Sequence, residues 1–356
     1  MTPRQPEPIN VHDYEALARS VLDPAVWAYY SGGAGDETSL RENRAAYERF
    51  RLLPRALRGI SEVELRTSVL GLPVEMPVLV SPMALHGLAS EAGECATARA
   101  AGSTGTVFTT SIEASRTLEE VAAAATGPIW SQLYHYPDRG VVESLVRRME
   151  AAGFGAIVLT VDSPRWGRHE RSERTPSKSL ATRGANLDLG YYDPAIWEHA
   201  VSWRDVEWLR SVTDLPLILK GILHPQDAAL AARHGAAAII VSNHGGRQLD
   251  GAIASLDALP AVADAAGDTV EVYLDGGIRR GTDILRALTL GARAVLVGRP
   301  VLWGLAAGGE AGARRVLELL GEELESALAL CGLSGVEAAR KIGRELLASP
   351  ELPRRL

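Results

Sequence analysis

The sequence predicts an α/β protein: a single (β/α)8 TIM barrel with an N-terminal helical segment and a lid insertion after the fourth strand. Eight short apolar runs recur along the chain, and Ala-rich amphipathic stretches separate most of them. The starts of successive runs lie 22 to 33 residues apart, with one exception. One strand and one helix per unit at this rhythm are typical of a closed parallel barrel. A doubly wound open sheet is the alternative, but no GxGxxG turn follows any run.

The elements follow this rhythm in order. Residues 1–76 precede the barrel, and 11–37 predict two short helices that end at a glycine-rich turn. The barrel spans 77–347, and 348–356 form a tail. Amphipathic segments that end near a glycine predict helices at 91–103, 141–154 and 224–236, and 301–347 also reads as helical. The expected strands are 77–83, 106–111, 129–134, 156–162, 216–221, 238–244, 271–277 and 294–300.

The composition excludes several functional classes. The 356 residues carry a net charge of −7, which argues against nucleic acid as the main partner. Apolar residues at 46% argue against disorder. No apolar stretch reaches ~18 residues, so we expect no membrane span. Two cysteines, Cys95 and Cys331, and an N-terminus without an apolar segment favour a reduced cytoplasmic chain.

One interval between strands is about twice the others. The extra residues lie at about 163–205, after the fourth predicted strand, and are rich in Arg, Ser and Gly. Loops that follow barrel strands lie at the face where active sites form. Long loops in compact domains are usually functional or disordered. We therefore expect a lid here, with a passive surface insertion as the alternative.

Polar residues gather at the carboxyl ends of otherwise apolar strands. A closed barrel brings all of these ends to one mouth, which predicts a binding site there. No His, Cys, Asp or Glu residues stand at metal-ligand spacing, so no metal is expected. The strand-end residues are Gln132, Tyr134, Thr160, Asp162, Lys220, Ser242, His244, Arg247, Asp275 and Arg299.

The last two strands carry the signature of a phosphate site. DGGIRRGTD (275–283) and VGRP (297–300) follow strands seven and eight, where barrels commonly bind phosphate through glycine amides and a helix N-terminus. Gly277 and Gly298 allow close approach of the backbone, and Arg279 and Arg299 add charge-assisted contacts.

Four side chains suggest catalysis or substrate binding. Lys220 closes an apolar strand, so it must meet an anion or lose its proton, and it could face an electron-rich cofactor or form a Schiff base. His244 follows the next strand and, with Asp162 across the mouth, would make a general base with an orienting carboxylate. Arg247 could hold a substrate carboxylate in a bidentate manner.

At this point the chain resembles a known family. The segments YYSGGAGDE, SPMA, QLYHYPDR, TVDSPRWGR, LKGI, SNHGGRQLDG, DGGIRRGTD and GRP occur in this order between about residues 10 and 345. They are similar to the FMN-dependent 2-hydroxy acid oxidases and dehydrogenases, and the MALHGLA turn is most similar to the lactate oxidase branch. The resemblance implies oxidation of a small 2-hydroxy acid to the 2-oxo acid, with oxygen or another electron acceptor, and a homotetramer that sometimes pairs into an octamer.

The resemblance also assigns roles to residues. The backbone of Pro82, Met83 and Ala84 would face the reactive nitrogen of FMN. Other cofactor contacts would come from Ser111, Gln132 and Thr160 at the ring edge, Lys220 at the N1–C2 side, Ser242 and Asp275 at the ribityl chain, and Gly277, Arg279, Gly298 and Arg299 at the phosphate. For the substrate, His244 would take a proton, Asp162 would stabilise the imidazolium, Tyr134 would contact the hydroxyl, and Tyr29 and Arg247 would bind the carboxylate.

Two positions depart from the family pattern. His169 stands where the family carries a second carboxylate-binding arginine, so either Arg168 or Arg171 compensates or the acid is held less firmly. Glu113 stands where an aromatic residue is usual, which indicates a polar or cationic substrate group or a water-filled pocket, unless the side chain points outward. These departures leave two alternatives: an FMN enzyme redirected to an amine-bearing or biosynthetic substrate and, more remotely, a flavin-free Schiff-base lyase that uses Lys220.

Overall fold

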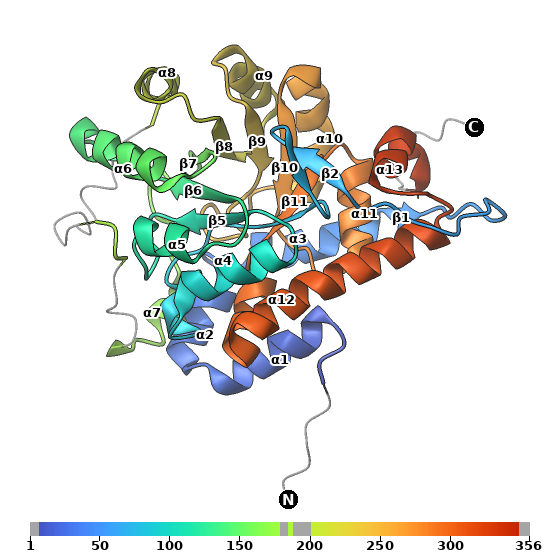
Figure 1. Cartoon of the computed structure of the whole chain (residues 1–356), viewed down its shortest axis with the longest axis horizontal. Coiled ribbons are helices and arrows are strands. Elements are labelled where there is room, and N and C mark those ends of the chain that lie inside the picture. The colour runs from blue at the N-terminus through green and yellow to red at the C-terminus, as the bar shows by residue number, and fades with distance from the viewer. Residues whose placement is uncertain (1–6, 179–183, 188–200, 349–356) are drawn as a thin grey trace, which may run out of the picture.

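Eight parallel strands close into a barrel (Figure 1), which confirms the predicted fold and excludes the open sheet. The computed structural model describes residues 7–178, 184–187 and 201–348. Neighbouring strands run in the order β10-β11-β4-β5-β6-β7-β8-β9. The barrel strands are β4 (Val78–Val80), β5 (Phe108–Ser111), β6 (Ile129–Leu133), β7 (Ile157–Thr160), β8 (Leu217–Ile222), β9 (Ala238–Val241), β10 (Glu271–Asp275) and β11 (Ala294–Val297).

Helices surround the barrel, and their ends carry the expected signals. Thr117 and Glu120 form a reciprocal capping box at the start of α5, and Gly153 ends α6 with φ +83°. The predicted helices at 91–103, 141–154, 224–236 and 301–347 are confirmed as α4, α6, α9 and the pair α12 and α13. The helices are α4 (Gly93–Ser103), α5 (Leu118–Ala124), α6 (Arg139–Ala152), α7 (Glu170–Glu173), α8 (Trp203–Val212), α9 (Pro225–Arg233), α10 (Ser255–Ala266), α11 (Gly281–Thr289), α12 (Arg299–Leu330) and α13 (Val336–Ile342).

The N-terminal segment contains the two expected helices, α1 (Val11–Val21) and α2 (Pro24–Ser31). A third helix, α3 (Thr38–Arg49), was not predicted, because its sequence is largely polar. Helix α1 packs along α12 (Figure 1). Two short antiparallel pairs complete the segment: β2 (Thr67–Val69) with β3 (Leu72–Val74), and β1 (Arg51–Leu52) with β12 (Leu347–Ala348).

Several predictions fall outside the described residues. The predicted lid at 163–205 is described only at 163–178, 184–187 and 201–205, where it contains the one-turn helix α7 and the start of α8. The tail is described only at its first residue, Ala348. In the described part of the chain, no helix is long and apolar enough to cross a membrane, and no cluster of three or more His, Cys, Asp or Glu side chains is placed to hold a metal ion.

The apolar core has two layers, because side chains alternate along each strand. On β8, Ile218 packs inside the barrel, whereas Leu217 and Leu219 pack outward against the helices. The same alternation holds on the other strands. The residues that fill the barrel interior include Leu79, Val107, Trp130, Val158, Ile218, Ile240, Tyr273 and Leu296.

Candidate active site

A layer of polar residues lies one step above this interior core. Continuing the alternation by two residues on β8 leads from Ile218 to Lys220, and on β6 from Trp130 to Gln132. Period-two alternation therefore turns these strand-end side chains into the barrel mouth. The residues at this level are Ser81, Ser111, Gln132, Thr160, Lys220, Ser242, Asp275 and Gly298.

Apart from Ser242, these residues border a cavity of about 520 Å³, within the range typical of small-molecule and cofactor sites. Most of the predicted site residues line it: Tyr29, Pro82, Met83, Ala84, Ser111, Glu113, Gln132, Tyr134, Thr160, Lys220, His244, Arg247, Asp275, Gly277, Arg279, Gly298 and Arg299. Asp162, His169 and Ser242 are not part of the lining, and each lies directly behind a residue that is.

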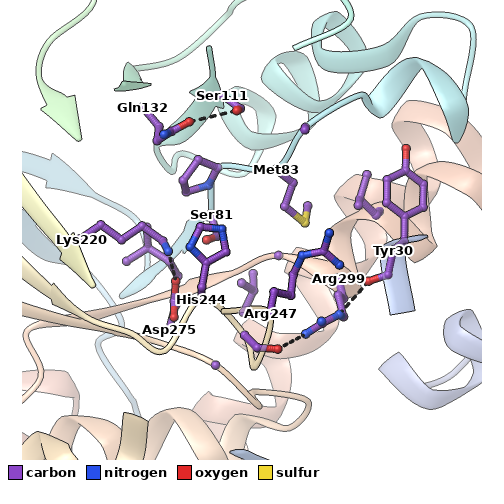
Figure 2. A pocket seen from close by; sticks show the side chains of 18 of the residues that line it. Tyr30, Ser81, Met83, Ser111, Gln132, Lys220, His244, Arg247, Asp275 and Arg299 are labelled. Atoms are coloured by element: carbon purple, nitrogen blue, oxygen red, sulfur yellow. Dashed lines mark hydrogen bonds and ion pairs between the residues drawn. The ribbon is translucent and has the colours of Figure 1, made fainter. Parts of the chain in front are cut away.

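Hydrogen bonds join the polar layer into two groups. Ser111 donates to the Gln132 side-chain oxygen at 2.9 Å, and the Gln132 amide donates to Thr160 at 3.0 Å. On the following strands, Lys220 Nζ donates to Ser242 Oγ at 3.1 Å and lies 3.4 Å from an oxygen of Asp275 (Figure 2). All six side chains are buried. One carboxylate oxygen of Asp275, Oδ1, is buried and has no hydrogen-bond partner in the described structure, so it is available to a hydroxyl in the cavity.

His244 and Asp162 form the predicted acid–base pair. Nδ1 of His244 lies 2.9 Å from Oδ1 of Asp162, and the His244 amide donates to Ser242 Oγ at 3.0 Å. Burial lowers the pKa of His244, although Asp162 opposes the shift. Burial would raise the pKa of Asp162, but the positive charges of His244 and Lys220 leave it lowered. The imidazole is therefore neutral near pH 7, with the proton on Nδ1 and a free lone pair on Nε2.

Arg247, Tyr29 and Tyr134 lie near His244 in the cavity. The Arg247 guanidinium donates to the Tyr29 carbonyl at 2.6 Å and lies 5.1 Å from the centre of the Tyr29 ring. Burial raises the pKa of Tyr29, and burial together with the charges of Asp162 and Glu113 raises that of Tyr134. Both phenols thus stay protonated and can donate hydrogen bonds beside a fixed cation.

His169 lies behind Arg247 rather than on the cavity surface. Its Nε2 lies 2.8 Å from the Arg247 carbonyl, and burial beside Arg247 lowers its pKa to about 4. It therefore carries no charge near pH 7. Neither neighbouring arginine lines the cavity: Arg168 lies 3.3 Å from a Glu173 oxygen, and Arg171 pairs with a carboxylate of α3's N-cap, Glu37. The expectation that Arg168 or Arg171 compensates is thus not supported.

Glu113 lines the cavity, so its side chain does not point outward as the alternative required. Trp166, at the start of the predicted lid, also lines it and packs edge-to-face on Tyr134, with 5.8 Å between ring centres. Two aromatic rings and a carboxylate therefore form one wall.

The phosphate site predicted at the last two strands contains two cations, the buried Arg279 and the half-buried Arg299. Arg299 donates to the carbonyls of Tyr30, Gly245 and Gly32 at 2.8, 3.0 and 2.8 Å (Figure 2). Burial lowers its pKa to about 9, and burial lowers the pKa of Arg279 to about 10. No carboxylate among the described residues forms an ion pair with either side chain. Buried cations that have only neutral partners indicate an anion site.

Sequence reasoning missed several lining residues. Tyr30 lines the cavity and donates its hydroxyl to the Leu85 carbonyl, and Ser81 stands at the inward position of β4. The alternation along 77–83 could have identified Ser81. Nothing in the local sequence of α2 separates Tyr30 from a core tyrosine.

The donor set fits FMN. Arg279, Arg299 and the glycine backbone suit a phosphate, Asp275 Oδ1 suits a ribityl hydroxyl, and the Ser111–Gln132–Thr160 row suits a polar ring edge. Fold and site together define a (β/α)8-barrel oxidoreductase that uses a phosphate-bearing flavin.

Comparisons with known proteins agree. The FMN-dependent dehydrogenase family matches residues 18–348, and the chain belongs to this family. It is 49% identical to an L-lactate oxidase of Nostoc over 93% of this chain and 96% of that protein. It is 44% identical to a glycolate oxidase of Spinacia oleracea over 96% of this chain and 95% of that protein. A mandelate oxidase structure superposes with a TM-score of 0.90 at 42% identity, and the match covers 96% of this chain and 98% of that one.

The predicted family, FMN cofactor and reaction class, oxidation of a 2-hydroxy acid, are thereby confirmed. The redirected enzyme and the flavin-free lyase are not favoured.

Proposed function

We propose that the protein oxidises a small aliphatic 2-hydroxy acid and passes the electrons to oxygen, with His244 as the base. The His244–Asp162 contact of 2.9 Å at the edge of a cavity with buried cations carries this proposal. The balanced reaction is 2-hydroxy acid plus O₂ to 2-oxo acid plus H₂O₂. FMN, when bound, supplies the two-electron acceptor chemistry.

The chain's own residues bind and orient the acid. Arg247 and the Tyr29 hydroxyl hold the substrate carboxylate, and the protonated Tyr134 donates to the substrate hydroxyl. Nε2 of His244 then takes a proton from the substrate, and Asp162 stabilises the resulting imidazolium through Nδ1. Lys220 places a positive charge within the polar layer, 3.4 Å from Asp275. These roles account for every charged side chain that faces the substrate end except Glu113.

One wall of the cavity supports a small substrate. Glu113, Tyr134 and Trp166 share this wall, and a carboxylate is a poor neighbour for a buried aromatic substituent. The relative that is 49% identical acts on L-lactate by its name. The homo-oligomer implied by the resemblance and the cytoplasmic location inferred from the cysteines and the N-terminus stay predictions.

Anaerobic addition of L-lactate or glycolate should bleach the yellow protein, and air should restore the colour with one H₂O₂ per 2-oxo acid. Absorbance and a coupled peroxidase assay measure the two steps. We expect kcat/KM for these acids to exceed that for mandelate at least ~10-fold, because one wrongly sized substituent is worth about 1–3 kcal/mol. Bleaching without peroxide on aeration would contradict oxygen as the acceptor. Equal kcat/KM for mandelate would contradict the small-substrate proposal.

The pH profile should report the lowered pKa of His244. Because the neutral imidazole is the active form, kcat/KM should stay constant near pH 7 and fall only below the ordinary histidine value of 6.5. Asp162→Asn removes the charge that raises this pKa, so the acid limb should move to still lower pH while the maximal rate falls about 10²-fold. Steady-state rates from pH 4.5 to 8.5 measure both effects. An acid limb that moves upward in the variant would contradict the assignment.

A further inference from the structure

The carboxylate of Glu94 joins two loops of the cavity wall from behind. Glu94 is the second residue of α4 and is fully buried. Its Oε1 accepts hydrogen bonds from the amides of His86 at 2.8 Å and Ser115 at 2.9 Å. No Arg or Lys in the described residues forms an ion pair with it. A buried carboxylate held only by backbone donors exerts its effect on the position of that backbone.

The first loop follows β4, and its residues Ser81–Leu85 all line the cavity. It is held at both ends. The Ser81 amide donates to the Val297 carbonyl at 3.0 Å, and the Leu85 amide donates to the Glu113 carbonyl at 3.2 Å. Leu85 has φ +59°, a left-handed conformation that a leucine keeps only under constraint from its surroundings. Between these ends, the amides of Met83 and Ala84 donate to no acceptor within the described residues, so they remain available to the cavity.

The second loop follows β5, which ends at Ser111, and carries Glu113 to the cavity. It is tied to the first loop at three points. Besides the Leu85–Glu113 bond, Ser115 Oγ accepts from the Gly87 amide at 2.9 Å, and Glu94 Oε1 bridges the two loops. A Cβ on Gly87 would lie 2.8 Å from Ser115 Oγ, so the loops are already in close contact.

We propose that Glu94 is a positioning residue that sets the Ser81–Leu85 loop against the loop carrying Glu113, and so places the free amides of Met83 and Ala84 for the flavin. The proposal rests on the FMN site described above. It predicts that Glu94 controls cofactor affinity without touching the cofactor.

Three substitutions at position 94 distinguish the effects of the oxygen acceptor, of the negative charge and of the length of the side chain. Glu94→Gln keeps an oxygen acceptor in the same place. Glu94→Asp keeps the charge but withdraws it by one methylene. Glu94→Ala leaves two buried amides without an acceptor. Glu91→Ala is the matched control, because Glu91 is exposed just before the same helix.

We expect the FMN dissociation constant, measured by flavin fluorescence, to rise at least ~10-fold for Glu94→Ala and at least ~3-fold for Glu94→Asp. Glu94→Gln and the control should stay within about threefold. In the apoprotein, amide hydrogen exchange at 84–88 and 113–116 should become at least ~10-fold faster for Glu94→Ala, with no change in β8.

An unchanged FMN dissociation constant despite faster local exchange would overturn the proposal, as would exchange that rises equally in β8. Should Glu94→Ala fail to fold, wild-type affinity and exchange in Glu94→Asp would overturn it in the same way. A wild-type protein that binds no FMN would instead overturn the cofactor assignment, while the exchange measurements on the apoprotein would still report on the loops.

Discussion

Replacing His244 with Asn should lower kcat by about 10²- to 10⁴-fold while the protein stays yellow, because the substitution removes the general base and leaves the cofactor contacts in place. Asn is the suitable replacement at this position. His244 has φ +58°, and among non-glycine residues Asn tolerates this left-handed region well. The Ser242 Oγ contact to the backbone amide at 3.0 Å does not involve the imidazole and should persist.

Anaerobic stopped-flow reduction by L-lactate measures this effect directly, since it isolates flavin reduction from reoxidation. His12→Asn is the control, because the His12 side chain is 53% exposed and lies on α1, outside the cavity lining. Reduction within tenfold of wild type in His244→Asn would mean that another group takes the proton.

Arg279→Gln should weaken FMN binding about 10- to 150-fold, the effect of losing a charge-assisted contact of about 1.5–3 kcal/mol. Arg279 is 8% exposed, and its guanidinium lies 4.4 Å from the centre of the Trp303 ring. Among the described residues, the guanidinium donates only to the Ile278 carbonyl, at 2.8 Å. Its lowered pKa of about 10 reflects the burial of a cation without a carboxylate partner. A phosphate would supply the missing charge.

The neighbouring arginine gives a matched control. Arg280 is half-exposed and pairs with Glu323 at 3.1 Å, away from the cavity lining, so Arg280→Gln should change the FMN dissociation constant by less than about threefold. Fluorescence titration of the apoprotein measures both variants. Equal weakening by the two substitutions would indicate a general charge effect instead of a phosphate contact.

Most of the cofactor site could be predicted because it lies on strands. Period-two alternation turns Gln132, Thr160 and Lys220 into the barrel mouth once their strands are parallel and closed. The site residues on β10 and at the end of β11 follow the same rule. Strand rhythm and strand-end chemistry are both visible in the linear chain, so neither required the coordinates.

The substrate end was harder to predict because it lies on loops. His169 occupied the expected place in the sequence, yet its ring contacts the Arg247 carbonyl instead of the cavity. Loop side chains have no periodicity that fixes their direction, and their partners come from distant segments: Arg171 meets Glu37 across more than a hundred residues. The described part of the predicted lid includes only Trp166 and Gly184 on the cavity lining.

Glu94 and Tyr30, which lie on helices, also could not be assigned to the site from the sequence. In the sequence, Glu94 resembles an ordinary surface glutamate at the start of a helix, and Tyr30 resembles a core tyrosine. Only packing brings the Glu94 carboxylate to two loop amides and the Tyr30 hydroxyl to the Leu85 carbonyl.

By itself, the sequence determined the closed barrel, the strand-borne polar layer and a phosphate site, because local hydrophobic periodicity and glycine-arginine turns encode them within each unit. The flavin followed from the resemblance to a known family. Tertiary structure alone decided which loop residues line the cavity and which hold its wall in place. Those contacts join segments far apart in the chain, and their geometry depends on how the loops pack together over the barrel mouth.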